Sequence, residues 1–353
     1  MNQTTYRPGV YSRYDLRNRY RGSRQGWAFV CAGAKTREGV SLPAGGVVKL
    51  ERISQLEGYF SPEDSGLYRM AKILLESGVE GVYALPVTID GSKPEDAAIY
   101  AALPKLGEIR RPGVVCCAAG GTEAAAKLAE AMAQCSSRER EKIAVGWCED
   151  SESAKQAAGS CNSERLVLVC QAGSDKEGEE GSSMLSAAAV AGMLAAAQAG
   201  ESFCNREIAL ASGVEAVEEE VLETLLGAGV TVLEMQDGVP VCVRAVTTRT
   251  KTGEEEDRTF LPVNTVLMID AVMQAVRQRL QGLLSQKVGM DEDAVAAQTA
   301  VALEEQRRKG LLVEFAPPVA FRDSDDPSVC QVEMELTLAA VWSQIYLTAL
   351  VQL

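Results

Sequence analysis

The absence of histidine excludes most of the catalytic chemistry that this sequence could otherwise perform. None of the 353 residues is a histidine, so the chain alone cannot build a Ser-His-Asp triad, a Cys-His dyad or a His-ligated zinc site. Ten cysteines are present without any C-x-x-C spacing, and some lie in apolar runs such as 166–170. A free cysteine in such a run behaves as a small buried apolar residue. We therefore expect no disulfide framework, no metal site and folding in a reducing cytosol.

One glycine-rich turn could bind a phosphate group. Gly120-Gly121-Thr122 follows an apolar run and opens a helix pattern, which is where α/β proteins bind phosphates. The G-x-G-x-x-G spacing is missing, and no lysine follows as it does in a P-loop. A nucleotide-binding α/β enzyme that uses this turn is kept as an alternative, and a tight turn between strand and helix is the simpler interpretation.

Acidic side chains occur in four runs that could supply paired carboxylates. The runs are Glu179 and Glu180; Glu218, Glu219 and Glu220; residues 254–257; and residues 323–326. A general acid needs a desolvated carboxyl group with a raised pKa, and each run lies in polar sequence or at the expected start of a helix. We expect solvated surfaces, no catalytic residue, no cofactor and no enzyme activity.

Charge is distributed unevenly along the chain. The net charge is −14, yet residues 1–24 contain six arginines and a single acid, Asp15, which leaves −19 for the remainder. Four tyrosines alternate with these arginines, and too few aliphatic residues are present for a core. Such an arm could stack on nucleic acid or dock on an acidic surface of an identical neighbour. The second extension, a strand-like tail over 328–353, favours self-assembly, because two extensions supply what strand addition between subunits needs.

The elements that position these residues alternate between strand and helix. Apolar runs predict strands at 27–31, 47–50, 82–87, 114–118, 143–147, 166–170 and 230–235. Helices are predicted from Ser61 to Gly78 and over 94–103, 123–134, 184–198 and 214–226. This alternation is typical of an α/β fold (α+β overall) with a central, mostly parallel sheet flanked by helices.

The pattern changes after residue 235. Asp237-Gly238 predicts a tight turn before a second apolar run over 239–246. Two helices follow, at 266–283 and 291–309, and residues 331–338 alternate between polar and apolar as a strand would. We divide the chain into an N-terminal arm (1–24), an α/β body (25–236, in two parts, 25–110 and 111–236), a C-terminal α+β domain (237–327) and a strand arm (328–353).

Five motifs, taken in order, resemble contractile tail sheath proteins of bacteriophages, phage-like bacteriocins and related contractile injection systems. The resemblance extends over nearly the whole chain. The motifs are Arg7-Pro8-Gly9-Val10-Tyr11; Asn162-Ser163-Glu164-Arg165 at the start of a strand; the Ala-rich helix of 187–192; residues 227–230 through 243–250; and Asn264-Thr265 with Asp270.

The resemblance implies a structural protein of a virion or phage-like particle tail, assembled in the bacterial cytoplasm. Family members polymerise as stacked hexameric rings in a helical polymer around an inner tube, and their contraction drives the tube through a target envelope. The implied partners are the protein itself, the tail tube protein, and baseplate and tail terminator proteins, with no nucleic acid and no membrane. Terminal arms join neighbours by strand exchange, and the implied contact residues are Arg7, Pro8, Gly9, Val10, Tyr11, Arg13, Arg17, Ile345, Leu347, Ala349 and Val351.

Overall fold

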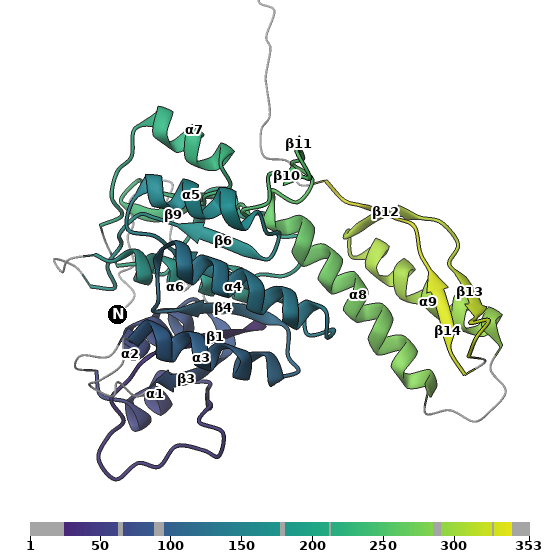
Figure 1. Ribbon diagram of the computed structural model, residues 1–353, viewed down its shortest axis with the longest axis horizontal. Coiled ribbons are helices and arrows are strands. Elements are labelled where there is room, and N and C mark those ends of the chain that lie inside the picture. The colour runs from purple at the N-terminus through teal and green to yellow at the C-terminus, as the bar shows by residue number, and fades with distance from the viewer. Residues whose placement is uncertain are drawn as a thin grey trace, which may run out of the picture.

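A computed structural model describes residues 25–62, 66–87, 95–176, 181–211, 213–284, 291–326 and 328–340. Its centre is a six-stranded sheet with the strand order β2-β3-β1-β4-β5-β6 (Figure 1). Every neighbouring pair is parallel except β2 with β3, so the predicted mostly parallel sheet is confirmed. The strands are β1 (Gln25–Gly33), β2 (Val48–Leu50), β3 (Val79–Val87), β4 (Gly113–Cys117), β5 (Lys142–Trp147) and β6 (Leu166–Val169).

Helices cover both faces of this sheet. Successive residues of β1 point to opposite sides, so that Ala28 and Val30 belong to one buried core while Trp27 and Phe29 belong to the other. The first core lies under α1 (Ile53–Tyr59), α2 (Gly66–Glu76) and α6 (Ser183–Ala196), and the second under α3 (Glu95–Glu108), α4 (Gly121–Ser136) and α5 (Ser151–Cys161). The body is therefore a three-layer α/β/α structure.

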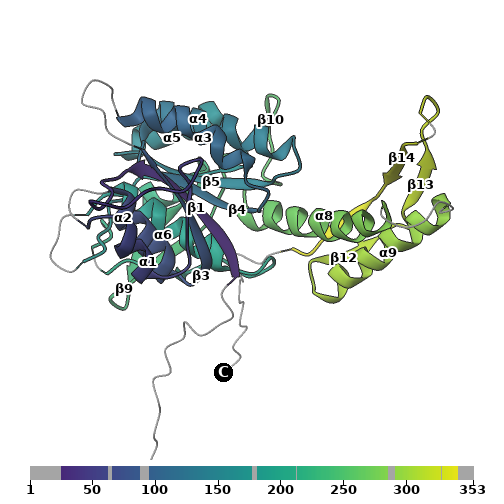
Figure 2. The same cartoon turned by 90° about the horizontal axis from the view of Figure 1, so that it is seen from below.

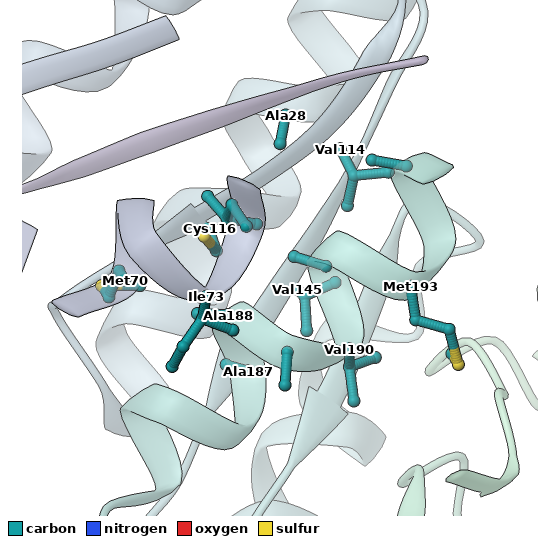
Figure 3. Packing of buried hydrophobic residues seen from close by; sticks show 14 of the residues in the cluster. Ala28, Met70, Ile73, Val114, Cys116, Val145, Ala187, Ala188, Val190 and Met193 are labelled. Carbon is teal, nitrogen blue, oxygen red and sulfur yellow. The ribbon is translucent and has the colours of Figure 1, made fainter. Parts of the chain in front are cut away.

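Helix α6 is the central helix of the first core. Its small residues allow close packing on the sheet, and Ala187, Ala188 and Val190 lie beside Val145 and Cys116 (Figure 3). Nearly every residue of the helix is buried, which explains why its sequence is apolar on all sides and not on one face only.

The body differs from the sequence prediction at several elements, and the short helix α1 was not expected. Helix α5 was not expected, because it buries only small residues, Ala154, Ala157 and Ala158, and so lacks a long apolar stripe. The run 230–235 does not join the parallel sheet. Its strand β8 (Val232–Gln236) pairs with β9 (Val239–Arg244) in a separate antiparallel sheet that also contains β7 (Arg206–Glu207).

The Asp237-Gly238 turn explains this second sheet. Both residues have positive φ angles, 50° and 81°, as a two-residue hairpin requires, and the predicted tight turn is confirmed. Helix α7 (Glu219–Gly227), which precedes this hairpin in the chain, starts later than expected, at 219 and not at 214.

The last part of the chain projects from the body (Figures 1 and 2). We call it the C-terminal limb. It consists of α8 (Val263–Leu284), α9 (Glu292–Arg308), β12 (Leu312–Phe315), β13 (Val319–Arg322), β14 (Cys330–Glu333) and β15 (Leu336–Leu338). A small apolar core of its own joins α8 to α9 and to the strands, with Met268, Val272 and Leu303 among its buried members.

The strand-like tail is two strands and not one. Residues 331–338 do alternate between exposed and half-buried, as predicted, but β14 pairs with β13 and β15 pairs with β12 of the same chain. The predicted arm 328–353 is thus folded onto its own chain as far as these strands reach, and residues 341–353 lie outside the described residues. The domain boundaries stay predictions. The β8–β9 pair joins residues on both sides of the boundary placed at 236, and the β12–β15 pair joins residues on both sides of the one placed at 327.

Candidate functional site

The predicted subunit-contact residues lie outside the described residues. Those of the first arm fall within 1–24 and those of the second within 341–353, so their contacts stay predictions. The described part of the chain contains the surfaces that could receive such arms, and the junction that holds the limb on the body.

The side chain of Trp147 packs against the Gly120-Gly121 turn. Gly120 precedes the first residue of α4, and Gly121 has a φ of 83°. A methyl group at Gly120 would lie 2.5 Å from the indole carbons of Trp147, whose Nε1 donates a hydrogen bond to the carbonyl oxygen of Cys117 (3.3 Å). The close approach of the indole explains Gly120, and the positive φ explains Gly121, so both glycines support the tight-turn interpretation.

Three carboxyl groups of the acidic runs have a lowered pKa, which is the opposite of the shift that a general acid needs. Hydrogen bonds from Thr252 and Thr259 hold the pKa of Asp257 at about 2, and turn hydrogen bonds lower the pKa of Asp323 and Asp326. Glu218, Glu219 and Glu220 are exposed; Glu179 and Glu180 lie outside the described residues.

The ten cysteines are free thiols, and seven of them are buried. Burial raises the pKa of Cys117 to about 12 and raises that of Cys116 as well, so these thiols are unreactive at neutral pH. In the described part of the chain no group of three or more acidic or cysteine side chains could hold a metal ion.

Asn162 lies at the junction between the parallel sheet and the limb. It caps the C-terminal end of α5, and its backbone has the left-handed conformation (φ 39°). Its side-chain Oδ1 accepts hydrogen bonds from the backbone N–H groups of Thr250 (3.0 Å) and Lys251 (3.1 Å), and its Nδ2 donates to the carbonyl oxygen of Lys251 (2.9 Å). One amide side chain thus fixes a loop that lies 88 residues further along the chain.

Thr248 and Thr231 also hydrogen-bond to residues at and before β6. Thr248 Oγ1 accepts from the N–H of Ser163 (2.9 Å) and donates to the carbonyl oxygen of the same residue (3.0 Å). The N–H of Thr248 donates to the carbonyl oxygen of Leu166, and the N–H of Thr231 donates to that of Leu168. These bonds cover the outer edge of β6, which ends the parallel sheet at this strand.

Two ion pairs then attach α8 to the body. Arg165, at the start of β6, forms a bidentate pair with Asp270 of α8 (2.6 and 2.8 Å), and the two side chains are only 11% and 13% exposed. Two turns further along α8, Arg277 pairs with the buried Glu141 (2.6 Å). Burial raises the pKa of Asp270, although the hydrogen bonds and the positive charge of Arg165 act to lower it. Burial acts to lower the pKa of Arg165, but the bidentate hydrogen bonds and the charge of Asp270 raise it overall.

These contacts give the sequence motifs a physical role. Asn162 and Ser163 fasten the loop of residues 248–251, with Thr248 as one receiving group, and Arg165 fastens α8 through Asp270. The sequence singled out these five residues through the family resemblance, but their pairing was not predicted. Glu141 and Arg277 were missed, since two charges that lie 136 residues apart carry no periodic signal.

The limb carries unpaired strand edges and exposed apolar side chains. Among the described residues, each of β12, β13, β14 and β15 has a hydrogen-bonded partner strand on one side only. Five of the seven large apolar side chains that are exposed in the described chain lie in the limb. They are Val301 (40% exposed), Val313 (57%), Val319 (56%), Phe321 (37%) and Val329 (43%). Free edges beside apolar side chains are the features that accept an added strand.

Comparisons with known proteins identify the fold. No protein-family model and no curated protein sequence matches the chain. Among solved structures, a chain of the six-fold symmetrised anti-feeding prophage baseplate superposes with a TM-score of 0.72 at 15% identity, covering 99% of this chain and 100% of that one. The contracted helical sheath of the anti-feeding prophage gives a TM-score of 0.69 at 15% identity, covering 99% of each chain.

A crystal structure of a sheath tail protein gives the same result. The protein from Desulfitobacterium hafniense has a TM-score of 0.67 at 10% identity, with 94% of this chain and 100% of that chain covered. The resemblance to tail sheath proteins is thereby confirmed at the level of the fold, from the body into the limb. Within the described residues, no helix combines the length and apolarity needed to cross a bilayer.

Proposed function

We propose that this chain, which has the fold of contractile tail sheath proteins, is itself a sheath subunit of a phage-like tail or contractile injection system. The observation that carries the proposal is the extent of the structural match, which covers 99% of this chain and all of the matched baseplate chain. A match limited to the α/β body would fit many unrelated proteins, because one such fold supports many functions. A match that includes the projecting limb is far more specific.

The proposed assembly is a stack of hexameric rings around a tail tube. The solved structure with six-fold symmetry and the contracted helical sheath support this arrangement for a chain of the same fold. Baseplate, tube and tail terminator proteins are the proposed partners, and the bacterial cytoplasm is the proposed place of assembly. Contraction would release free energy stored in the extended array and drive the tube through the target envelope.

Strand exchange is the proposed link between subunits. The arms at 1–24 and 341–353 are proposed to add to the free edges of the limb sheets β12–β15 and β13–β14 in neighbouring copies. Many backbone hydrogen bonds must break together to separate such a joint. The ion pairs that Arg165 and Glu141 form with α8 would transmit mechanical force from the limb to the body.

The proposal is tested by assembly of the purified chain. Negative-stain images of concentrated protein are expected to show tubes or ring stacks, and a variant lacking residues 1–24 is expected to show none. A full-length variant with Arg7, Arg13 and Arg17 replaced by glutamine is the control, since it keeps the arm and removes three of its charges. If the control assembles and the truncation does not, the backbone of the arm is needed. Wild-type protein that stays monomeric at every salt concentration contradicts the proposal.

A further inference from the structure

One stretch of the body's sequence carries charges of a single sign. Between Arg206 and Arg244 the sequence contains eight acidic residues and neither lysine nor arginine. All eight are exposed, and none forms an ion pair with another described residue. This acidic face consists of Glu207, Glu215, Glu218, Glu219, Glu220, Glu223, Glu234 and Asp237.

Members of two other acidic runs are compensated within the molecule. Glu256 pairs with Arg258, and Asp257 accepts a hydrogen bond from Thr252. Asp323 accepts hydrogen bonds from the N–H groups that follow it in its turn. The glutamates of α7 have no such arrangement, so their repulsion is left for solvent or for another molecule to offset.

A basic face lies at the amino end of the parallel sheet. The loops before β4 and β5 meet there, because Arg140 donates a hydrogen bond to the carbonyl oxygen of Gly107 (2.8 Å) and Lys142 donates to that of Ile109 (2.9 Å). The side chains that form this face are Lys105, Arg110, Arg111, Arg138 and Arg140, against only two exposed acids in these loops, Glu108 and Glu139.

Part of the basic face is held in place. The guanidinium group of Arg111 lies 4.6 Å from the ring centroid of Trp27, a cation–π contact that limits its motion. Glu141, the remaining acid of these loops, is buried and paired with Arg277, so it does not neutralise the exposed bases. Arg110 and Arg138 form no ion pair within the described part of the chain.

The two faces cannot meet within one molecule. In Figure 1, α7 lies at the outer side of the body beyond β6, whereas α3 lies at the opposite side. Two complementary patches at different places on one protein produce a head-to-tail contact, which closes into a ring or continues as a helical filament. We propose that the acidic face of one copy docks on the basic face of the next copy. This contact rests on the self-assembly proposed above and adds to it a surface distinct from the strand-exchange joints.

Charge reversal tests the contact with two complementary variants. The first carries Glu219→Lys, Glu220→Lys and Glu223→Lys, and the second carries Lys105→Glu, Arg110→Glu and Arg138→Glu. Each variant alone has two faces of the same sign and is expected to raise the critical concentration for assembly by about tenfold or more, measured by sedimentation. An equimolar mixture restores both pairings and is expected to return to within about twofold of wild type, as is a chain with all six substitutions.

A matched control separates this contact from total charge. The control carries Glu254→Lys, Glu255→Lys and Glu256→Lys on the exposed hairpin formed by β10 (Lys251–Thr252) and β11 (Glu255–Glu256). These substitutions change the net charge as much as the first variant does, and are expected to leave assembly unchanged. Circular dichroism checks that each variant is folded. If one of the two single-face variants does not fold, the chain with all six substitutions still tests the contact.

Three results would overturn the inference. The first is that both variants assemble as wild type does. The second is that only the acidic-face variant is impaired in assembly, which would make the basic arm of residues 1–24 the occupant of that face. The third is that both variants are impaired and their mixture does not restore assembly. A wild-type chain that does not assemble overturns the proposed function itself, and the contact with it.

Discussion

Arg165 and Asp270 connect two parts of the molecule through a single buried contact. Arg165, at the start of β6, donates two short hydrogen bonds to the carboxylate of Asp270 on α8. A buried ion pair adds little net stability compared with an apolar pair of the same volume, but removal of one partner leaves the other charge buried and unpaired. The pair therefore fixes the position of the limb more than it stabilises the fold.

Arg165→Ala is expected to lower the free energy of unfolding by roughly 3–5 kcal/mol, because the carboxylate of Asp270 loses its partner while it stays buried. Urea unfolding followed by circular dichroism measures this. The double variant Arg165→Met, Asp270→Leu is expected to recover most of the loss, since no buried charge then remains.

Lys155→Ala is the matched control for this prediction. It breaks an exposed pair with Glu152 and is expected to change stability by less than about 0.5 kcal/mol. A change for Arg165→Ala as small as that of the control would show that the pair does not hold the limb.

At the residue level, the sequence shows which residue types are missing, but it does not show which contacts the other residues form. The missing histidine and the unfavourable context of Gly120 could be assessed from residue types alone. The hydrogen bonds of Asn162 and Thr248 could not, because they join segments that only the folded sheet brings together.

At the scale of helices and strands, the feature that matters for assembly is the free strand edges of the limb. Val313 and Val319 are more than half exposed on strands that lack a second partner within the described residues. An exposed apolar edge of this kind attracts other strands unless something covers it. Strand addition by a neighbouring subunit would cover it.

Val313→Lys combined with Val319→Lys is expected to abolish assembly while the free energy of unfolding stays within about 0.5 kcal/mol of wild type, since both side chains are on the surface. Val301→Lys is the control, because Val301 is also exposed but lies on helix α9. Sedimentation measures assembly and urea unfolding measures stability. Equal loss of assembly in the control, or normal assembly of the double variant, would rule out these strand edges as the acceptors.

Most elements could be predicted from periodicity, and the failures have physical causes. The helix over 291–309 was placed correctly by its acidic start and basic end, and Asp291 does cap it. Helix α5 was missed because alanines replace the larger apolar residues that mark a stripe. Strand β8 was assigned to the wrong sheet because an apolar run predicts a strand but does not specify its partner.

At the scale of the whole molecule, the described residues form an α/β/α body joined to a limb with its own small core. The body has two large cores, one on each face of the sheet, and the limb packs mainly on itself. This division suits a subunit whose limb stays linked to its neighbours while its body changes position. The acidic and basic faces lie on the body, where contacts of about 0–1 kcal/mol per exposed pair can be exchanged at small cost.

A cryo-EM map of the assembled chain tests the central claim most directly. The account predicts that residues 1–24 and 341–353 of neighbouring subunits add strands beside the limb strands, so that each two-stranded limb sheet gains strands from other copies. A map in which both terminal segments pair with their own chain, or in which the limb edges face solvent in the assembled particle, would contradict it.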